Sequence, residues 1–345
     1  MKQKIRIAVV GAGLIGKRHL AAISVSEEAE VACVIDPTEA GRAYAQENGF
    51  QYYNSIAAMV AAGGTDGVIL ATPNQVHVEN GLECVAAGLP TLVEKPLASD
   101  VASAQTLVDA ALAADVPLLT GHHRRHNPLI QAAKARIDAG DLGTVTAIHG
   151  QCWFFKPDDY FDVAWRRAKG AGPVFVNLIH DIDLLRYLCG DVVSVQAMES
   201  NAVRGNAVEE TAVILLRFEN GALGTVNVSD TVVAPWSWEM TARENPAYPA
   251  VDQSCYTVGG THGSLSLPDL TFWHHPERRS WWAPISATRS PRSYDDPLAC
   301  QIAQFAAVIR GEESPLVSGA EGLATLKVVE AVKRAAETGT VITDL

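Results

Sequence analysis

The chain has 345 residues, enough for two hydrophobic cores, and a formal net charge of −12. That charge excludes the basic surface to which nucleic acids and anionic membranes bind, and no apolar run approaches the roughly 20 residues that cross a bilayer. We therefore expect neither nucleic acid nor a membrane as a partner. The six cysteines are scattered without a C-x-x-C pair, which favours reduced thiols in a cytoplasmic protein.

Short apolar strands alternate with helical stretches in the first third of the chain. The expected strands are 5–10, 31–35, 67–71, 91–94 and 117–120, and the helices between them are 15–25, 38–48, 75–87 and 101–114. Near-continuous apolar strands alternating with helices predict a doubly wound parallel sheet that is covered on both faces. We assign residues 1–121 to this Rossmann domain.

Strands dominate from residue 122 onward, after a helix that Asn127-Pro128 opens and Gly140 ends. Strands are expected at 143–155, 192–201, 211–218, 222–230, 237–241, 255–259 and 264–267, and further helices near 176–188, 297–310 and 320–336. The turn Glu219-Asn220-Gly221 is typical of a hairpin. Residues 122–345 are therefore expected to form an α+β domain with a largely antiparallel open sheet, whose last helix is free to pack back toward the first domain.

The loop Gly11-Ala12-Gly13-Leu14-Ile15-Gly16 follows the first expected strand and opens the first helix. This is the position of the dinucleotide-binding fingerprint. Gly11 permits the tight turn, Gly13 lets the backbone approach the pyrophosphate, and Gly16 lets helix and strand pack closely, with the phosphates at the helix N-terminus. Asp36 ends the second strand twenty residues after Gly16, where a carboxylate accepts hydrogen bonds from the adenosine ribose.

Asp36 also indicates which dinucleotide binds. Its charge repels a 2′-phosphate, and the nearest candidate clamp for that phosphate, Arg42, lies well inside the next helix. We therefore predict NAD, with NADP disfavoured. The residues alone leave open that the glycines are ordinary turn glycines and that Asp36 caps the helix that follows it.

Two further strand ends carry recognisable motifs, Ala71-Thr72-Pro73-Asn74-Gln75-Val76-His77 and Val93-Glu94-Lys95-Pro96-Leu97. With the glycine loop and His19, they resemble the glucose–fructose oxidoreductase/inositol dehydrogenase (Gfo/Idh/MocA) family. The second domain extends the resemblance through Trp165-Arg166, Gly170-Ala171-Gly172 and a helix that contains His180. The resemblance implies an NAD(P)-dependent oxidoreductase, and it does not specify the substrate.

Lys95 follows a buried strand near the centre of the expected parallel sheet. The carboxyl ends of such strands border the crevice where open α/β sheets bind ligands. Partial desolvation beside other cations lowers the pKa of an ammonium toward neutrality, so that it can give or take a proton. Spacing alone fits a surface lysine before a helix-starting proline equally well. The resemblance implies the catalytic role, and a cis peptide before Pro96.

His180 lies on an expected helix, with Asn177 one turn before it on the same face. A single histidine on such a helix is more typical of a core or capping residue. The resemblance implies a catalytic histidine, often assisted by an aspartate four residues earlier, but that position is Val176 here. We therefore expect Asn177 to orient substrate, and Asp181 and Asp183 to be helix-surface groups or supporting groups of the site.

Other contacts follow from the resemblance. It implies that the cofactor also contacts Leu14, Ile15, Thr72, Pro73, Asn74, His77, Glu94 and Lys95. It implies substrate contacts from Lys95, Arg124, Trp165, Arg166, Asn177 and His180. Trp165 offers an apolar platform for a sugar ring, and Arg166 offers donors for hydroxyls or a carboxylate. A structural Trp–Arg cation–π pair is the alternative.

These observations predict an NAD-dependent dehydrogenase that oxidises a hydroxyl of a sugar, inositol or related polyol, with Lys95 and His180 handling the proton. Redox-assisted glycoside cleavage or dihydrodiol oxidation with the same cofactor stays open, as does a non-catalytic sensor of NAD or sugar. The paired histidines His122-His123 and His274-His275 lack companion ligands at the right spacing, so no metal is expected. The resemblance further implies a homodimer or homotetramer, for which the outer face of the antiparallel sheet is free.

Overall fold

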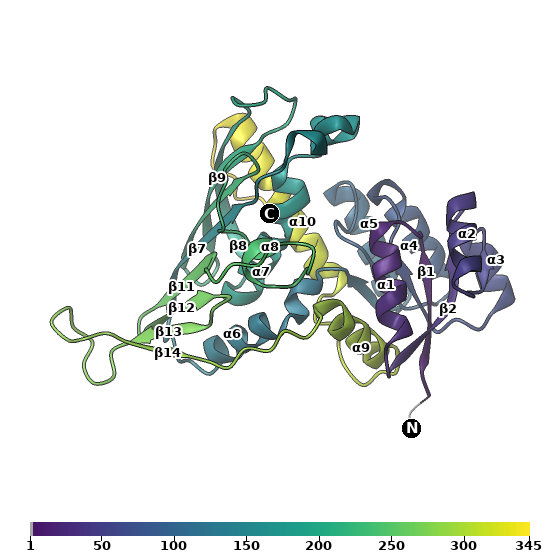
Figure 1. Cartoon of the computed structure of the whole chain (residues 1–345), viewed down its shortest axis with the longest axis horizontal. Coiled ribbons are helices and arrows are strands. Elements are labelled where there is room, and N and C mark those ends of the chain that lie inside the picture. Colours follow the sequence, from purple (N-terminus) through teal and green to yellow (C-terminus); the bar gives the residue numbers. More distant parts are fainter. Residues whose placement is uncertain (1–2) are drawn as a thin grey trace. The chain divides into compact units, whose positions relative to one another are not determined.

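The computed structural model describes residues 3–345, which form two compact units (Figure 1). The first unit consists of residues up to 126 together with 296–326, and the second of residues 127–295 together with 327–345. Each unit has its own hydrophobic core. Residues 296–326, which follow the antiparallel strands in sequence, thus pack with the N-terminal part of the chain.

The first unit is built on a six-stranded, wholly parallel sheet in the order β3-β2-β1-β4-β5-β6. Its strands are β1 Ile5–Val10, β2 Ala29–Ile35, β3 Tyr52–Tyr53, β4 Gly67–Leu70, β5 Thr91–Val93 and β6 Leu118–Thr120. The order reverses direction between β1 and β4. Such a switch point opens a ligand crevice at the carboxyl ends of these strands, because right-handed crossovers on its two sides lead to opposite faces.

Helices cover this sheet, as the sequence pattern predicts. They are α1 Leu14–Ser24, α2 Glu39–Glu47, α3 Ile56–Ala62, α4 His77–Ala86, α5 Val101–Ala113 and α9 Pro297–Ile309, with short 3-10 turns at η1 Asn74–Val76 and η2 His123–His126. Helix α9 packs against α1 and β2 and adds Leu298, Ile302 and Phe305 to the core of the unit. The short elements β3 and α3 are not predicted from the sequence pattern.

The second unit is built on an eight-stranded sheet in the order β14-β13-β12-β11-β7-β10-β9-β8. Its strands are β7 Val145–Trp153, β8 Val192–Ser200, β9 Thr211–Phe218, β10 Leu223–Ser229, β11 Tyr256–Gly260, β12 Gly263–Leu267, β13 Thr271–His274 and β14 Ser286–Arg289. All neighbours are antiparallel except β7 and β10. Helices α6 Pro128–Asp138 and α7 Ile179–Cys189 pack on this sheet, and the later turns of α10 Gly319–Thr338 join the same core (Figure 1). The predicted fold class is confirmed.

One predicted strand, at 237–241, is wrong. These residues form the short helix α8 Trp238–Thr241, because the Ser237 side chain accepts a hydrogen bond from the backbone N–H of Met240 and so caps a helical turn. The helix expected from residue 176 also differs, since it begins with a wider π-helical turn, η5 Val174–Leu178. Within residues 3–345, no helix combines the length and apolarity needed to cross a bilayer.

Candidate active site

The glycine loop has the geometry of an anion site at the N-terminus of α1. Gly11 has a φ of +93°, and a Cβ there would lie 2.7 Å from the carbonyl oxygen of Ala71. A Cβ on Gly16 would lie 1.9 Å from the carbonyl oxygen of Gly11, so both positions require glycine. Gly13, the N-cap, has no atom of the described chain other than its own neighbours in sequence within 4 Å of its would-be Cβ, and it provides no side-chain cap. The first N–H groups of α1 therefore remain available to a phosphate.

Asp36 closes the loop from the end of β2. One carboxylate oxygen accepts the backbone N–H of Ala12 at 2.8 Å, and the other accepts the N–H and hydroxyl of Thr38 at 2.8 and 2.6 Å. Burial opposes ionisation, but these hydrogen bonds outweigh it and lower the pKa of Asp36. The residue is therefore a carboxylate that orders the glycine loop, and it retains acceptor capacity for a ribose hydroxyl.

His77 ties together the two motif segments that follow β4 and β5. Its side chain is buried, and its ring nitrogens lie 2.9 Å from the carbonyl oxygens of Pro96 and Thr72. Burial lowers the pKa of His77 although both carbonyls favour a proton on the ring. The hydroxyl of Thr72 is buried without a hydrogen-bond partner within residues 3–345, so it can still serve a bound ligand. Pro73 and Asn74 form the exposed and half-buried start of the same turn.

The Glu94 side chain contacts both His19 and the backbone of Lys95. Its Oε1 lies 2.7 Å from Nε2 of His19, and its Oε2 accepts the backbone N–H of Lys95 at 3.2 Å. Burial of Glu94 raises its pKa, but the hydrogen bond and charge of His19, with the charges of His123 and Lys95, lower it to about 2. An ionised, buried carboxylate thus stands at the carboxyl end of β5, and Lys95, next to it, is half-buried.

The predicted proton residue of the second unit, His180, lies in the first turn of α7 and is buried. Asn177 lies in the π-helical turn before it, with Nδ2 at 3.4 Å from Oε1 of Glu239. Asp181 is fully buried and accepts a short hydrogen bond from the hydroxyl of Tyr256, and Asp183 is buried as well. These two aspartates are therefore not helix-surface groups, because α7 is covered on nearly every side.

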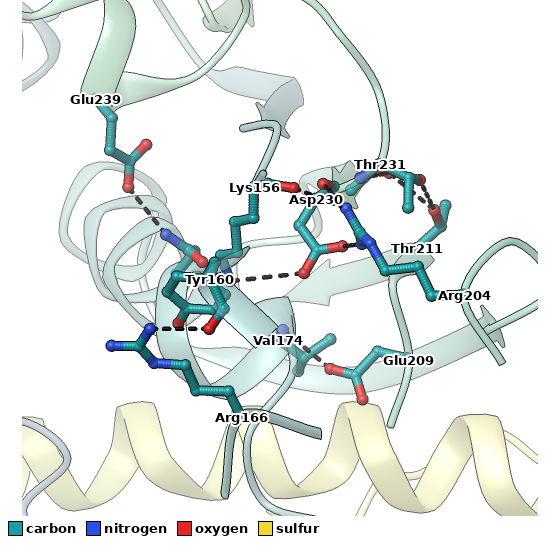
Figure 2. Close-up of polar contacts among 12 residues, drawn as sticks. Lys156, Tyr160, Arg166, Val174, Arg204, Glu209, Thr211, Asp230, Thr231 and Glu239 are labelled. Atoms are coloured by element: carbon teal, nitrogen blue, oxygen red, sulfur yellow. Dashed lines mark hydrogen bonds and ion pairs between the residues drawn. The ribbon is translucent and has the colours of Figure 1, made fainter. Parts of the chain in front are cut away.

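Trp165 and Arg166 lie on the irregular segment between β7 and α7. Trp165 is 56% exposed, and Arg166 stacks on Tyr160, with Cζ 4.1 Å from the ring centroid, more closely than on Trp165 at 5.7 Å. Arg166 also donates from Nη1 to the carbonyl oxygen of Tyr160 (Figure 2). The ring of Trp165 thus remains open to solvent. Arg124, the other predicted substrate contact, is buried within η2 of the first unit.

Two family models match this chain in succession. The oxidoreductase family with an NAD-binding Rossmann fold matches residues 5–122, and the GFO/IDH/MocA C-terminal domain matches residues 130–266. The chain belongs to the GFO/IDH/MocA oxidoreductase family.

Individual relatives of this family match over nearly the whole chain. The rhizopine catabolism protein MocA of Rhizobium meliloti is 28% identical over 95% of this chain and 94% of its own length. The scyllo-inositol 2-dehydrogenase (NAD(+)) of Bacillus subtilis is 26% identical, with coverages of 95% and 93%. A solved structure of the WlbA dehydrogenase from Bordetella pertussis, in complex with NADH and UDP-GlcNAcA, has a TM-score of 0.78 at 26% identity and covers 99% of both chains.

The first unit is the cofactor-binding part of the chain, and the cofactor is NAD. Three features of the unit fit that dinucleotide: the open N-terminus of α1, the Asp36 carboxylate and the buried Thr72 hydroxyl. Within residues 3–345, no cluster of three or more His, Cys, Asp or Glu side chains is placed to hold a metal ion.

Sequence reasoning missed several supporting residues. His19 belongs to the family pattern, but its partnership with Glu94 spans 75 positions, and so does that of Tyr256 with Asp181. No local pattern signals pairs this far apart. The group formed by the buried Lys156 and Asp230 with the largely covered Arg204 is not predicted from the sequence either, since each lies in ordinary loop or strand-end sequence.

Proposed function

We propose that the protein is an NAD-dependent dehydrogenase that oxidises a hydroxyl group of a sugar, inositol or related polyol. The observation that carries this proposal is the setting of Lys95, which lies two residues after the end of β5 and whose backbone N–H is bound by the buried, ionised Glu94. Relatives named as inositol and apiose dehydrogenases support the substrate class.

The chain's own residues divide the work. Bound NAD would supply the nicotinamide that accepts the hydrogen and its electron pair from the carbinol carbon. The hydroxyl proton would pass to Lys95 Nζ, with His180 as its partner in handling that proton. Trp165, Arg166, Asn177 and Arg124 would hold the other substrate groups, which fixes the carbon that reacts. Leu14 and Ile15 would cover the pyrophosphate, and Asn74, with Pro73, would contact the nicotinamide side.

The decisive experiment measures NADH formation at 340 nm with a panel of aldoses, inositols and sugar acids. We expect steady turnover with at least one member, and a loss of at least about a thousandfold in kcat for Lys95→Ala while that variant still binds NAD. Lys134→Ala, which removes a lysine from the surface of α6, is the matched control and should keep wild-type activity. Wild-type kcat in Lys95→Ala would contradict the assigned role.

The same panel separates the alternative functions. An enzyme that recycles its cofactor, as in redox-assisted glycoside cleavage, would convert substrate without net NADH, which product analysis would detect. A sensor of NAD or sugar would bind without turnover by any substrate. The presence of both Lys95 and His180 favours the dehydrogenase, because a sensor has no need of groups that move protons.

We further propose a cytoplasmic homodimer or homotetramer. One face of the eight-stranded sheet exposes apolar side chains, with Met198 at 77%, Leu223 at 52%, Leu215 at 49% and Val213 at 46% exposure. Such a face is suited to pairing with a second copy. Light scattering should give a multiple of 36.8 kDa for the wild-type chain, and Leu215→Glu should lower that mass. A wild-type monomer would contradict this assignment.

A further inference from the structure

A buried group of charges holds the start of the segment that carries Trp165 and Arg166. Asp230, just after β10, lies 2.5 Å from Nη1 of Arg204 and 3.6 Å from Nζ of Lys156 (Figure 2). Arg204 also donates from Nη2 to the carbonyl oxygens of Lys156 and Asp230, both at 2.9 Å. We call Lys156, Arg204 and Asp230 the Asp230 anchor.

The anchor is more deeply buried than ordinary surface ion pairs. The side chains of Lys156, Arg204 and Asp230 are only 6%, 13% and 3% exposed. Burial lowers the pKa of Lys156 and raises that of Asp230, although the two charges oppose both shifts. Removing one member of such a group leaves the others buried without compensation, which costs far more than the loss of a surface pair.

The anchor connects to Arg166 through aromatic rings. Nζ of Lys156 lies 5.0 Å from the ring centroid of Tyr160, and Arg166 stacks on that same ring at 4.1 Å. Arg204 stacks on Phe161, the next residue, at 4.4 Å. Figure 2 shows Lys156, Tyr160 and Arg166 gathered in one place. The two cations of the anchor therefore each contact one of the two rings that precede Arg166: Lys156 contacts Tyr160, and Arg204 contacts Phe161.

The far end of the segment is pinned separately. The Glu209 side chain accepts the backbone N–H of Val174 at 3.1 Å and is held by Lys333 at 2.5 Å. A Cβ on Gly172 would lie 2.2 Å from Oε1 of Glu209, so the chain passes directly over this carboxylate. The stretch between the two attachments has only short 3-10 turns of its own, η3 Asp158–Asp162 and η4 Ala164–Arg167.

We propose that the Asp230 anchor positions Arg166, and with it Trp165, for substrate. The anchor residues are positioning residues that act through Tyr160 and Phe161. The inference rests on the proposed function only in assigning substrate contact to Arg166. The mechanical part, that the anchor keeps residues 157–167 in place, stands independently.

The test uses Asp230→Asn in the full-length protein, with Asp344→Asn as the control. Asp344 pairs with Arg334 at 2.9 Å, but that pair is exposed. Trypsin has cleavage sites after Arg166, Arg167 and Lys169 in the anchored segment. We expect native-state cleavage there to accelerate about tenfold in Asp230→Asn and not in Asp344→Asn, because the loosened segment opens more often.

Kinetics supply the second readout. With the polyol identified above, Asp230→Asn should raise the substrate KM about tenfold, leave kcat within about twofold, and leave the KM for NAD unchanged. A role in stability alone would lower the amount of active enzyme, and so reduce the apparent kcat at unchanged KM. Lys156→Met should raise the substrate KM as well, and Lys156→Arg should raise it much less, because the arginine keeps the charge beside Asp230.

The outcomes are distinguishable. Wild-type cleavage rates in a folded Asp230→Asn protein would overturn the proposal, as would an unchanged substrate KM. If Asp230→Asn does not fold, Arg204→Lys keeps the charge and removes the hydrogen bonds from Nη2 to the carbonyl oxygens of Lys156 and Asp230, and the same two measurements apply. If no polyol is oxidised by the wild-type protein, the proposed function fails alone, and the cleavage rates decide whether the anchor holds the segment.

Discussion

Asp36 performs two tasks with one carboxylate. Its oxygens accept the Ala12 N–H of the glycine loop and the N–H and hydroxyl of Thr38, the N-cap of α2, and its lowered pKa keeps it negatively charged. The side chain that caps α2 is that of Thr38, which accepts the N–H of Gly41, so Asp36 holds the cap residue and does not itself cap the helix. Its hydrogen bond to the ribose stays a prediction. We therefore expect a single substitution of Asp36 to affect both the order of the glycine loop and the choice of cofactor.

For Asp36→Ser we predict a tenfold to hundredfold loss in kcat/KM with NAD, which corresponds to about 1.5–3 kcal/mol for a charge-assisted hydrogen bond. The loss with NADP should be smaller, because repulsion of the 2′-phosphate disappears and Arg42 is exposed on α2 nearby in sequence. Steady-state kinetics with both dinucleotides measures this ratio. An unchanged NAD/NADP ratio would show that Asp36 does not select the cofactor.

Glu94 makes the stability of the first unit depend on pH. Because its pKa falls from the usual 4.5 to about 2, its ionised form stabilises the fold above about pH 4.5, and this stabilisation is lost as the pH falls toward 2. Glu94→Gln should therefore lower the free energy of unfolding at pH 7 by on the order of 3 kcal/mol, which appears as a lower Tm. The difference in Tm from wild type should shrink below pH 4. Glu83→Gln, at an exposed position on α4, is the control. A Tm difference that is constant from pH 7 to pH 3 would contradict the assignment.

At the scale of elements, prediction from sequence succeeded where local periodicity decides the structure. The strand at 211–218 and the β1 strand at 5–10 have the predicted bounds, since apolar residues run through each strand and a segment with glycine follows it. The predicted strand at 237–241 failed because an apolar–polar alternation competes there with the capping of Ser237. Strands β13 and β14 lie at one edge of the sheet and have little apolar periodicity of their own, so their pairing depends on β12.

In the candidate site, too, features that follow a local sequence pattern could be predicted, and features that depend on distant contacts could not. The glycine loop and Asp36 follow a local pattern with a physical reason for each residue, and the structure places them as that pattern requires. The roles of His19 and Tyr256 depend on contacts between distant segments, which spacing along the chain does not encode. The catalytic pairing of Lys95 with His180 stays a prediction.

The junction between β1 and α1 gives a matched pair of variants. Gly16→Ala places a Cβ 1.9 Å from the backbone oxygen of Gly11, so strand and helix must separate, and we expect a lower Tm and weaker NAD binding. In Gly13→Ala the new Cβ meets no atom of the described chain within 4 Å apart from its neighbours in sequence, so Tm should be unchanged while NAD binding weakens about tenfold or more. Calorimetry and NADH fluorescence titration measure the two effects. Strong NAD binding by Gly13→Ala would place the pyrophosphate elsewhere.

Across the whole molecule, the cysteines are protected thiols. Five of the six are buried and Cys300 is partly exposed; burial raises the pKa of Cys33 to about 11 and those of Cys84 and Cys189 to about 12. Since the thiolate is the reactive form, we predict that at most one thiol per native chain reacts quickly with Ellman's reagent at pH 8, and all six after unfolding. Rapid reaction of three or more thiols in the native protein would contradict this picture of the cores.

The cofactor-binding unit is completed late in the chain. Its sheet begins at residue 5, yet Ile309 and Phe305 of α9 press against Gly67 of β4, where a Cβ would lie 2.5 Å from the Ile309 side chain. During synthesis on the ribosome, the part of the apolar surface of helices α1 to α5 and strands β1 to β6 that α9 covers therefore stays exposed until residues 296–326 have been made. The nascent chain should depend on chaperones throughout that interval, and a gene fragment that stops at residue 126 should yield an aggregating polypeptide rather than a transplantable dinucleotide-binding module.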